Sequence, residues 1–172
     1  EDDLLEEITY LVEYPTAFYG EFNKDYVKLP KEVVTTPMKE HQRYFPVSKD
    51  GKLLPYFIAV RNGDKHAIDI VKAGNEKVLE ARLADALFFY DEDIKKPLES
   101  FVENLKTVVF QAKLGTVYDK TLRIEKLAQD IVETLDEKDI LNDTLRAAKL
   151  CKADLVTNMV FEFTELQGVM GR

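Results

Sequence analysis

The short segment around residue 42 has the composition of a nucleic-acid contact. Side chains that can donate hydrogen bonds come together there with an aromatic pair: Lys39, His41, Gln42, Arg43, Tyr44 and Phe45. Basic and amide groups suit phosphate oxygens, and aromatic rings suit stacking on an unpaired base. In the alternative interpretation, the two aromatic residues divide between the core and the surface of a strand, and the basic groups are merely solvated. The sequence leaves both interpretations open.

A second basic group surrounds the joint between two predicted helices further along the chain. Its members are Lys113, Lys120, Arg123 and Lys126. Helix N-termini add amide donors at such a joint, so it is a better phosphate candidate than a basic run such as Lys95-Lys96. The competing interpretation is a solvated helix surface.

The charge of the chain limits how it could meet a nucleic acid. There are 24 Lys and Arg against 32 Asp and Glu, which gives a net charge of −8 over 172 residues. This balance argues against a protein that binds nucleic acid over its whole surface. The charge is uneven, however, because Tyr26–His66 and Lys106–Lys126 each carry more basic than acidic residues. A local basic face could therefore still contact phosphates.

Few residues are available for metal or redox chemistry. Cys151 is the single cysteine, which excludes an internal disulfide and a cysteine-rich metal site. No apolar run approaches the roughly 20 residues that span a bilayer. The first residues, EDDLLEEI, are too acidic for a signal or transit peptide. We therefore expect no metal site, no membrane partner and a cytoplasmic location.

The first 73 residues are predicted to form a small α+β unit. Apolar residues on one face predict a helix over Leu4–Val12, which Tyr14-Pro15 should end. A strand is expected at Thr16–Phe22. Asp50-Gly51 between two strand-like runs, 42–48 and 54–60, is a strong hairpin signal. Short helices are expected at 30–40, interrupted at Pro37, and at His66–Lys72.

From Gly74 the apolar period becomes helical, so residues 74–172 are predicted to form a mostly helical domain. Three helices, each with a buried apolar stripe, are expected in succession. The second should run from Leu98 to Ala112, with Pro97 in its first turn and a left-handed Gly115 at its end. The stripe of the third is Ile124, Leu127, Ala128, Ile131, Val132 and Leu135. Two further helices are expected at Arg146–Lys152, capped by Asn142 or Asp143, and at Asp154–Phe163. The predicted fold class is α+β, an antiparallel-sheet unit followed by helices.

Several long strings resemble one known family. They are GNEKVLEARLADALFFYDEDIKKPLE, FQAKLGTVYDKTLRIEKLA, LVTNMVFEFTELQGVMGR and, at His41–Val47, HQRYFPV. They resemble the β subunit of bacterial-type glycyl-tRNA synthetase, over nearly the whole chain from Leu4 to Arg172. The resemblance implies an internal piece of a longer subunit that is not catalytic by itself and supports binding of tRNA(Gly). It also implies a separate α subunit that activates glycine, ATP with Mg as cofactors of the whole enzyme, and none for this piece.

The helical half also resembles the HD superfamily of metal-dependent phosphohydrolases. Those enzymes place a histidine on one helix and a His-Asp pair on another, so that several ligands hold a divalent metal that activates water. If Ala153-Asp154 stands at the pair, the histidine is missing, and Asp119 and Asp154 cannot rebuild the site. We expect an HD-like domain that has lost this chemistry. The alternative is a metal-dependent phosphohydrolase or an aminoacyl-tRNA editing domain.

Overall fold

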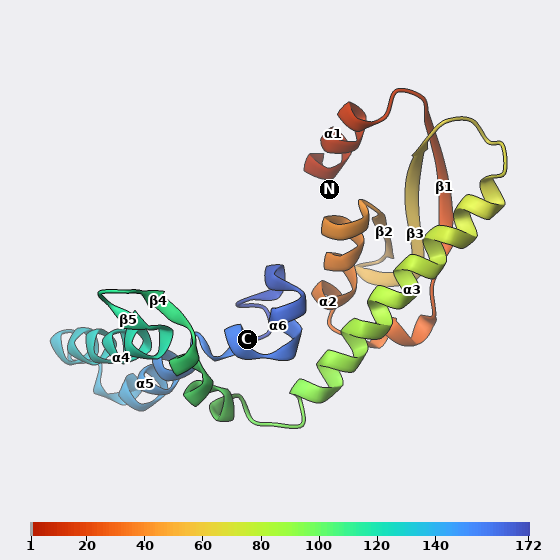
Figure 1. The fold of residues 1–172 in the computed structure, drawn as a ribbon. Coiled ribbons are helices and arrows are strands. Elements are labelled where there is room, and N and C mark those ends of the chain that lie inside the picture. The colour runs from red at the N-terminus through yellow and green to blue at the C-terminus, as the bar shows by residue number, and fades with distance from the viewer. Residues whose placement is uncertain (1) are drawn as a thin grey trace. The chain divides into compact units, whose positions relative to one another are not determined.

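The computed structural model describes residues 2–172 and confirms an α+β protein. It divides into two compact units, one ending at Phe89 and the other comprising Tyr90–Arg172 (Figure 1). The division predicted between residues 73 and 74 falls inside the long helix α3 (Ile68–Asp93), so residues 74–89 belong to the first unit.

The first unit contains a three-stranded antiparallel sheet in the order β1-β3-β2. Its strands are β1 (Pro15–Glu21), β2 (Phe45–Lys49) and β3 (Lys52–Asn62). The predicted β2–β3 hairpin is confirmed, with Asp50 at φ 51° and Gly51 at φ 77°. Two successive positive φ angles match the twist of the strands on either side, which is why Asp-Gly is favoured in such a turn.

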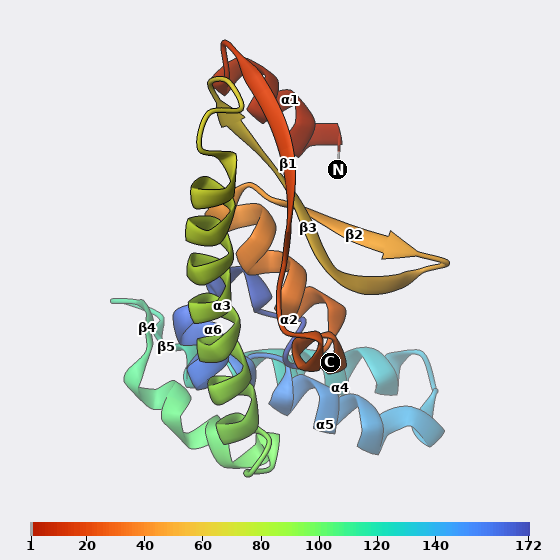
Figure 2. The ribbon, with the colours of Figure 1, turned by 90° about the vertical axis from the view of Figure 1, so that its right-hand side faces the viewer.

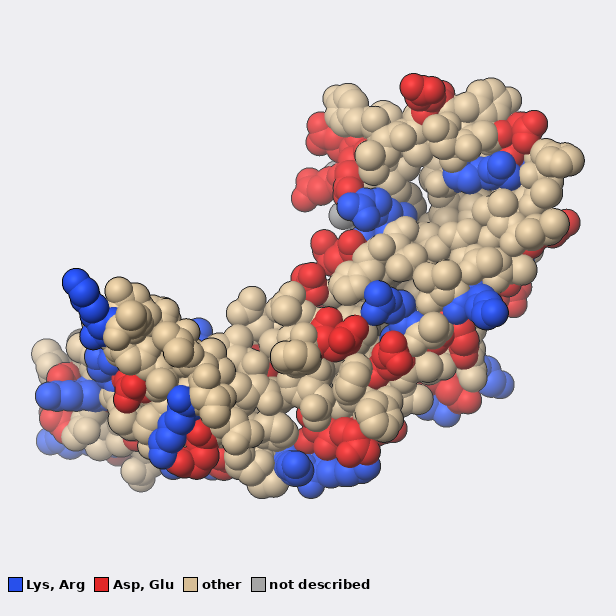
Figure 3. Space-filling model, viewed as in Figure 1, with Lys and Arg blue, Asp and Glu red and all other residues tan. Residues whose placement is uncertain are grey.

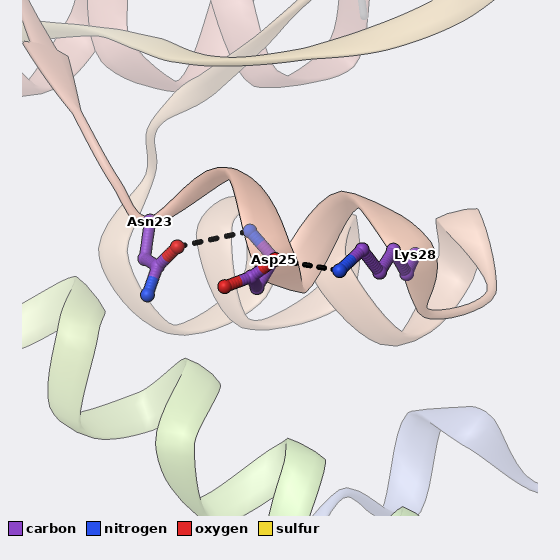
Figure 4. Close-up of polar contacts among 3 residues, drawn as sticks. All are labelled: Asn23, Asp25 and Lys28. Atoms are coloured by element: carbon purple, nitrogen blue, oxygen red, sulfur yellow. Dashed lines mark hydrogen bonds and ion pairs between the residues drawn. The ribbon is translucent and has the colours of Figure 1, made fainter.

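Helices of three kinds complete the first unit. They are α1 (Asp2–Leu11), the 3-10 helix η1 (Lys24–Lys28), α2 (Lys31–Thr36) and the π-helical turn η2 (Pro37–His41). In η1, Asn23 Oδ1 accepts a hydrogen bond from the Asp25 amide at 3.0 Å, and Lys28 Nζ lies 2.6 Å from Asp25 Oδ1 (Figure 4). The Lys28 ammonium lowers the pKa of the Asp25 carboxyl. η1 thus has both a cap and an internal ion pair that stabilise a short turn.

The helix α3 runs without a break through Gly74, where the sequence predicted a joint between two helices. An interior glycine costs a helix only about 1 kcal/mol relative to alanine. The apolar residues Leu79, Leu83 and Ala86 are completely buried, so burial outweighs this cost. The predicted break at Gly74 was therefore wrong.

The second unit consists mostly of short helices. They are η3 (Leu98–Thr107), α4 (Val117–Thr134), η4 (Lys138–Ile140), α5 (Leu141–Leu150), η5 (Ala153–Val156), α6 (Asn158–Glu162) and η6 (Thr164–Leu166). Phe101 and Val102 of η3 form a buried cluster with Ala153 of η5.

The helix predicted over Leu98–Ala112 was wrong. Its first part is the 3-10 helix η3, for which Pro97 is the N-cap, and its last part is a strand of a small hairpin. The hairpin strands are β4 (Val109–Gln111) and β5 (Gly115–Thr116). Consecutive β-branched and aromatic residues favour a strand here. Gly115 has a positive φ of 84°, as predicted, but it follows the hairpin turn and does not end a helix.

Three other predictions about the second unit also need correction. Of the predicted α4 stripe only Val132 is buried, whereas Leu127, Ile131 and Leu135 are exposed. The N-cap of α5 is Ile140, with no side-chain bond. The helix predicted at Asp154–Phe163 is split into η5 and α6 at Thr157, whose hydroxyl caps α6.

Candidate nucleic-acid interface

The residues around Arg43 lie where η2 leads into β2. Arg43 has a φ of 56°, and its Nε atom lies 2.6 Å from Glu7 Oε1 on α1. The backbone amides of Arg43 and Tyr44 close the turn on the carbonyls of Lys39 and Met38, at 3.2 and 2.8 Å. This sharp turn separates the direction of the Arg43 side chain from that of Tyr44.

Tyr44 belongs to the core of the first unit and is not a surface for stacking on a base. Its ring stacks on Phe57 with 4.6 Å between the centroids, and its hydroxyl donates to Asn75 Oδ1. Burial raises the pKa of Tyr44 to about 12. Of the two interpretations that the sequence left open, the core interpretation therefore describes Tyr44.

The polar residues of the same segment differ in how available they are. Lys39, His41 and Gln42 are half-buried, whereas Arg43 is exposed. The positive charge of Arg43 is partly balanced by the carboxylate of Glu7. A phosphate approaching Arg43 would have to compete with this ion pair, which is weak because it is exposed.

Two members of the second basic group contact the β4–β5 hairpin. Lys120 Nζ lies 4.0 Å from the centroid of the Phe110 ring on β4, and Arg123 Nη1 donates to the carbonyl of Leu114 at 3.0 Å. Lys113 is exposed in the hairpin turn, and Lys126 is exposed one turn further along α4. We call Lys113, Lys120, Arg123 and Lys126 the hairpin basic cluster.

Phe110 and Leu114 were not predicted as partners of this cluster. Both are exposed large apolar residues. The segment was predicted to be helical, so the strand β4, which places Phe110 next to Lys120, was not predicted. The run Val108-Val109-Phe110, with β-branched residues before an aromatic one, was the signal that could have revealed it.

The N-terminus of α4 does not offer the free amide donors that the sequence suggested. Thr116 Oγ1 accepts from the Asp119 amide at 3.2 Å, and Asp119 Oδ2 accepts from the Thr116 amide at 2.7 Å. This is a capping box, and the pattern Thr-x-x-Asp could have predicted it. The bonds from the Thr116 amide and hydroxyl lower the pKa of Asp119, so its negative charge at the helix start opposes a phosphate.

Lys106 is a further cation near α4, which the sequence analysis counted in a basic stretch but not among the candidate phosphate contacts. Its Nζ atom lies 2.6 Å from Glu103 Oε2 and 4.6 Å from the centroid of the Tyr118 ring. The hydrogen bond to Glu103 raises the pKa of Lys106. Because Glu103 neutralises it locally, Lys106 adds less to a phosphate site than the hairpin basic cluster does.

Acidic and basic side chains are mixed on the face of the molecule shown in Figure 3, over both units. This pattern agrees with the net charge of −8. On this face a phosphate contact would therefore be local and made by a few side chains.

The residues that the HD resemblance would place at a metal site do not fit a metal. Ala153 is completely buried and has no ligand atom in its side chain. Asp154, also buried, accepts a hydrogen bond from the Gly168 amide through Oδ2. Within residues 2–172 no group of three or more His, Cys, Asp or Glu side chains is arranged to hold a metal ion. The Asp154 carboxylate instead holds the C-terminal turn.

A model of the family described as "Glycyl-tRNA synthetase beta subunit" matches residues 1–172, the whole chain. The chain belongs to this family. Similar proteins named glycine–tRNA ligase β subunit occur in Clostridioides difficile (strain 630), 75% identical over 172 residues, and in Syntrophomonas wolfei, 56% identical over 174 residues. The protein of that name in Bacillus subtilis (strain 168) is 52% identical over 173 residues.

These glycyl-tRNA synthetase β subunits are much longer than this chain. The alignments cover 100%, 99% and 99% of the chain but only 25%, 25% and 26% of the three relatives. The chain thus spans about a quarter of the length of the relatives it matches. In the part of the chain that the structure describes, no helix combines the length and the apolar character needed to cross a membrane.

Proposed function

We propose that this chain is part of the β subunit of a glycine–tRNA ligase and supports tRNA binding for the ATP-dependent charging of tRNA(Gly). The observation that carries the proposal is the match of the family model to every residue of the chain. Its partners in this proposal are tRNA(Gly) and a glycyl-tRNA synthetase α subunit, and its location is the cytoplasm. ATP and Mg serve the whole enzyme.

The tRNA contacts are proposed to come chiefly from the hairpin basic cluster. Lys113 and Lys126 are exposed, and neither has an ion pair or side-chain hydrogen bond within residues 2–172, so both are free to meet phosphates. Arg123 and Lys120 use part of their bonding capacity on the hairpin, which holds them in place. Pre-positioned cations lose less side-chain entropy when they bind a phosphate. Lys39, His41, Gln42 and Arg43 form a second, weaker set.

The chain is proposed to have no catalytic site of its own. The metal-dependent phosphohydrolase or editing alternative gains no support, because Ala153, where the resemblance would require a histidine, has no ligand atom and Asp154 bonds the backbone. The fold of the second unit is proposed to be HD-like without that chemistry. Measurable glycyl-adenylate formation, or metal-stimulated phosphate release, by the 172-residue chain alone would contradict this part of the proposal.

Binding of tRNA(Gly) by the full α/β enzyme tests the proposal. Arg123→Ala and Arg43→Ala should each weaken tRNA binding and leave the formation of glycyl-adenylate unchanged. Glu7→Gln is the matched control for Arg43, since it breaks the same ion pair but keeps the cation. If Glu7→Gln weakens tRNA binding as much as Arg43→Ala does, the effect comes from the ion pair and not from a phosphate contact.

A further inference from the structure

The β4–β5 hairpin carries three large apolar side chains that are exposed to solvent. Val109, Phe110 and Leu114 have exposed fractions of 72%, 43% and 53%. In the view of Figure 2 the hairpin extends beyond the other elements of the second unit. Its two strands pair only with each other, so no third strand adjoins them in the part of the chain that the structure describes. The hairpin therefore presents apolar surface that the folding of its own unit leaves in water.

The cations beside this apolar surface have no carboxylate partner. Among residues 2–172, no member of the hairpin basic cluster forms an ion pair. Three of its members, Lys120, Arg123 and Lys126, follow one another at intervals of three residues, so they are spread along about 9 Å of α4. The carboxylate of Asp119 interacts with Arg123 through space, but it is bonded to the amide and the hydroxyl of Thr116. The positive charge of the cluster is therefore available to an anion.

The turn between these cations and apolar side chains is held in one conformation. Gln111 Oε1 accepts hydrogen bonds from the amides of Lys113 and Leu114, at 2.7 and 3.0 Å. The Leu114 carbonyl accepts the hydrogen bond from Arg123 on α4. Because these bonds form without a ligand, a ligand that binds here has fewer groups to order.

Unpaired RNA is the ligand that matches this combination of groups. The cations suit its phosphates, and every unpaired base offers a flat face on which an aromatic ring can stack. A base inside a duplex is already stacked on both sides, so a duplex would leave Phe110 in water. A protein partner fits less well, because lysine is depleted at protein–protein interfaces. Lys120 covers part of the Phe110 ring, and the remaining exposed fraction of 43% is accessible to a base.

We propose that Phe110 stacks on an unpaired base of the tRNA and that the hairpin basic cluster binds the phosphates on either side of this base. The inference rests on the proposed function, since it takes the cluster as part of the tRNA interface. It adds the kind of RNA that this interface recognises, which is a single-stranded segment and not a duplex.

A salt titration of tRNA(Gly) binding by the full α/β enzyme separates stacking from charge. Phe110→Leu keeps an apolar side chain but removes the ring, so it should weaken binding about tenfold, whereas Phe110→Tyr should stay within about twofold of the parent. Stacking releases no counterions, so the slope of log affinity against log salt should not change in Phe110→Leu. Lys113→Ala, in contrast, should reduce that slope by about one unit.

Val109→Thr is the matched control for the change in the hairpin. It keeps a β-branched side chain, and it alters the opposite face of the same strand, because successive side chains of a strand point to opposite faces. Val109→Thr should therefore bind tRNA(Gly) as the parent enzyme does. A loss of affinity equal to that of Phe110→Leu would mean that the whole hairpin has been disturbed, and it would overturn the stacking role.

A fully paired RNA duplex is the second probe. The parent enzyme and Phe110→Leu should bind it equally, since it offers no unpaired base to the ring. Equal losses of affinity for duplex and for tRNA would overturn the inference. A slope reduced by one unit in Phe110→Leu would overturn it too, because the ring would then only position Lys120.

Two further results would also contradict the stacking role. If Phe110→Leu leaves the affinity for tRNA unchanged, the stacking is refuted, and the result for Lys113→Ala decides separately whether the proposed function stands. If the α and β subunits of the Phe110→Leu enzyme separate in sedimentation, the apolar hairpin belongs to a protein interface instead.

Discussion

Among single residues, Asp93 has a clear structural role, because its carboxylate accepts the hydrogen bonds that hold the start of α6. It accepts hydrogen bonds from the Asn158 amide at 3.1 Å, the Asn158 side chain at 2.8 Å and the Met159 amide at 2.8 Å. Asp93 ends α3 and is 65 residues away from Asn158 in the sequence, so no local pattern could predict the pairing. Asp154 likewise accepts a hydrogen bond from a distant backbone amide, that of Gly168.

Asp93→Ala should lower the free energy of unfolding of the second unit by about 2 kcal/mol. Charged hydrogen bonds contribute about 1.5–3 kcal/mol, and two buried or half-buried amides lose their acceptor. Urea unfolding of the 172-residue chain measures the effect. Asp91→Ala is the matched control, since Asp91 is exposed on the same helix, and it should change the stability by less than about 0.5 kcal/mol. Equal stabilities of the two variants would contradict the capping role.

Tyr44 gives the first unit a defined dependence on pH. Its pKa in the folded chain is raised to about 12 by burial, above the ordinary value of 10.0. The unfolded chain therefore loses this proton first, and the free energy of unfolding should fall as the pH rises from 10 to 12. Tyr26, whose pKa is also raised to about 12 by burial and by Glu80, adds to the same decline.

Replacement of Tyr44 by phenylalanine should make that decline shallower. It should also cost about 1 kcal/mol at neutral pH, because Asn75 loses its hydrogen-bond partner. Urea unfolding at a series of pH values, with the absorbance of the phenolate followed in parallel, checks both effects. A decline between pH 10 and 12 as steep in Tyr44→Phe as in the parent chain would be the contrary result.

The contrast between the two hairpins shows, at the scale of elements, what the sequence could and could not predict. The β2–β3 hairpin was predicted because Asp50-Gly51 stands between two strand-like runs and fixes the turn. The β4–β5 hairpin was missed because Leu105, Val108, Val109 and Ala112 also fit a helical period. Short apolar runs are ambiguous between helix and strand, and Gly115 was assigned to the end of a helix instead of a turn.

The hairpin basic cluster depends on the start of α4, so its cap is open to a test. Thr116→Ala should lower the free energy of unfolding of the second unit by about 1 kcal/mol, because the Asp119 amide loses the acceptor of the capping box. Thr116→Ser keeps the hydroxyl and should be nearly neutral. Urea unfolding again provides the measurement. Equal destabilisation by both substitutions would mean that the methyl group of Thr116, and not the cap, is what matters.

For the whole molecule, composition and periodicity predicted the order of the main elements and the α+β class. They did not predict which of the polar and aromatic side chains pack or bond within the protein and are therefore unavailable to a ligand. Tyr44, for which the sequence left base stacking open, packs in the core, and Asp154, which the sequence placed at a lost metal site, anchors the backbone. Their roles depend on Phe57 and Gly168, which are separated from them by more than a turn or two of chain. Of the four cations of the second group, Lys120 and Arg123 contact the β4–β5 hairpin, which lies where the sequence predicted a joint between two helices.

The salt dependence of tRNA(Gly) binding by the full α/β enzyme tests the central claim, that the hairpin basic cluster contacts tRNA phosphates. Each phosphate contact releases counterions, so Lys113→Ala and Lys126→Ala should each weaken binding and reduce the slope of log affinity against log salt by about one unit. Lys77→Ala, which removes an exposed lysine from α3, is the matched control and should leave the slope unchanged. If the affinity and the slope of both cluster variants equal those of the parent enzyme and of Lys77→Ala, the cluster is ordinary solvated surface and the account of tRNA binding is contradicted.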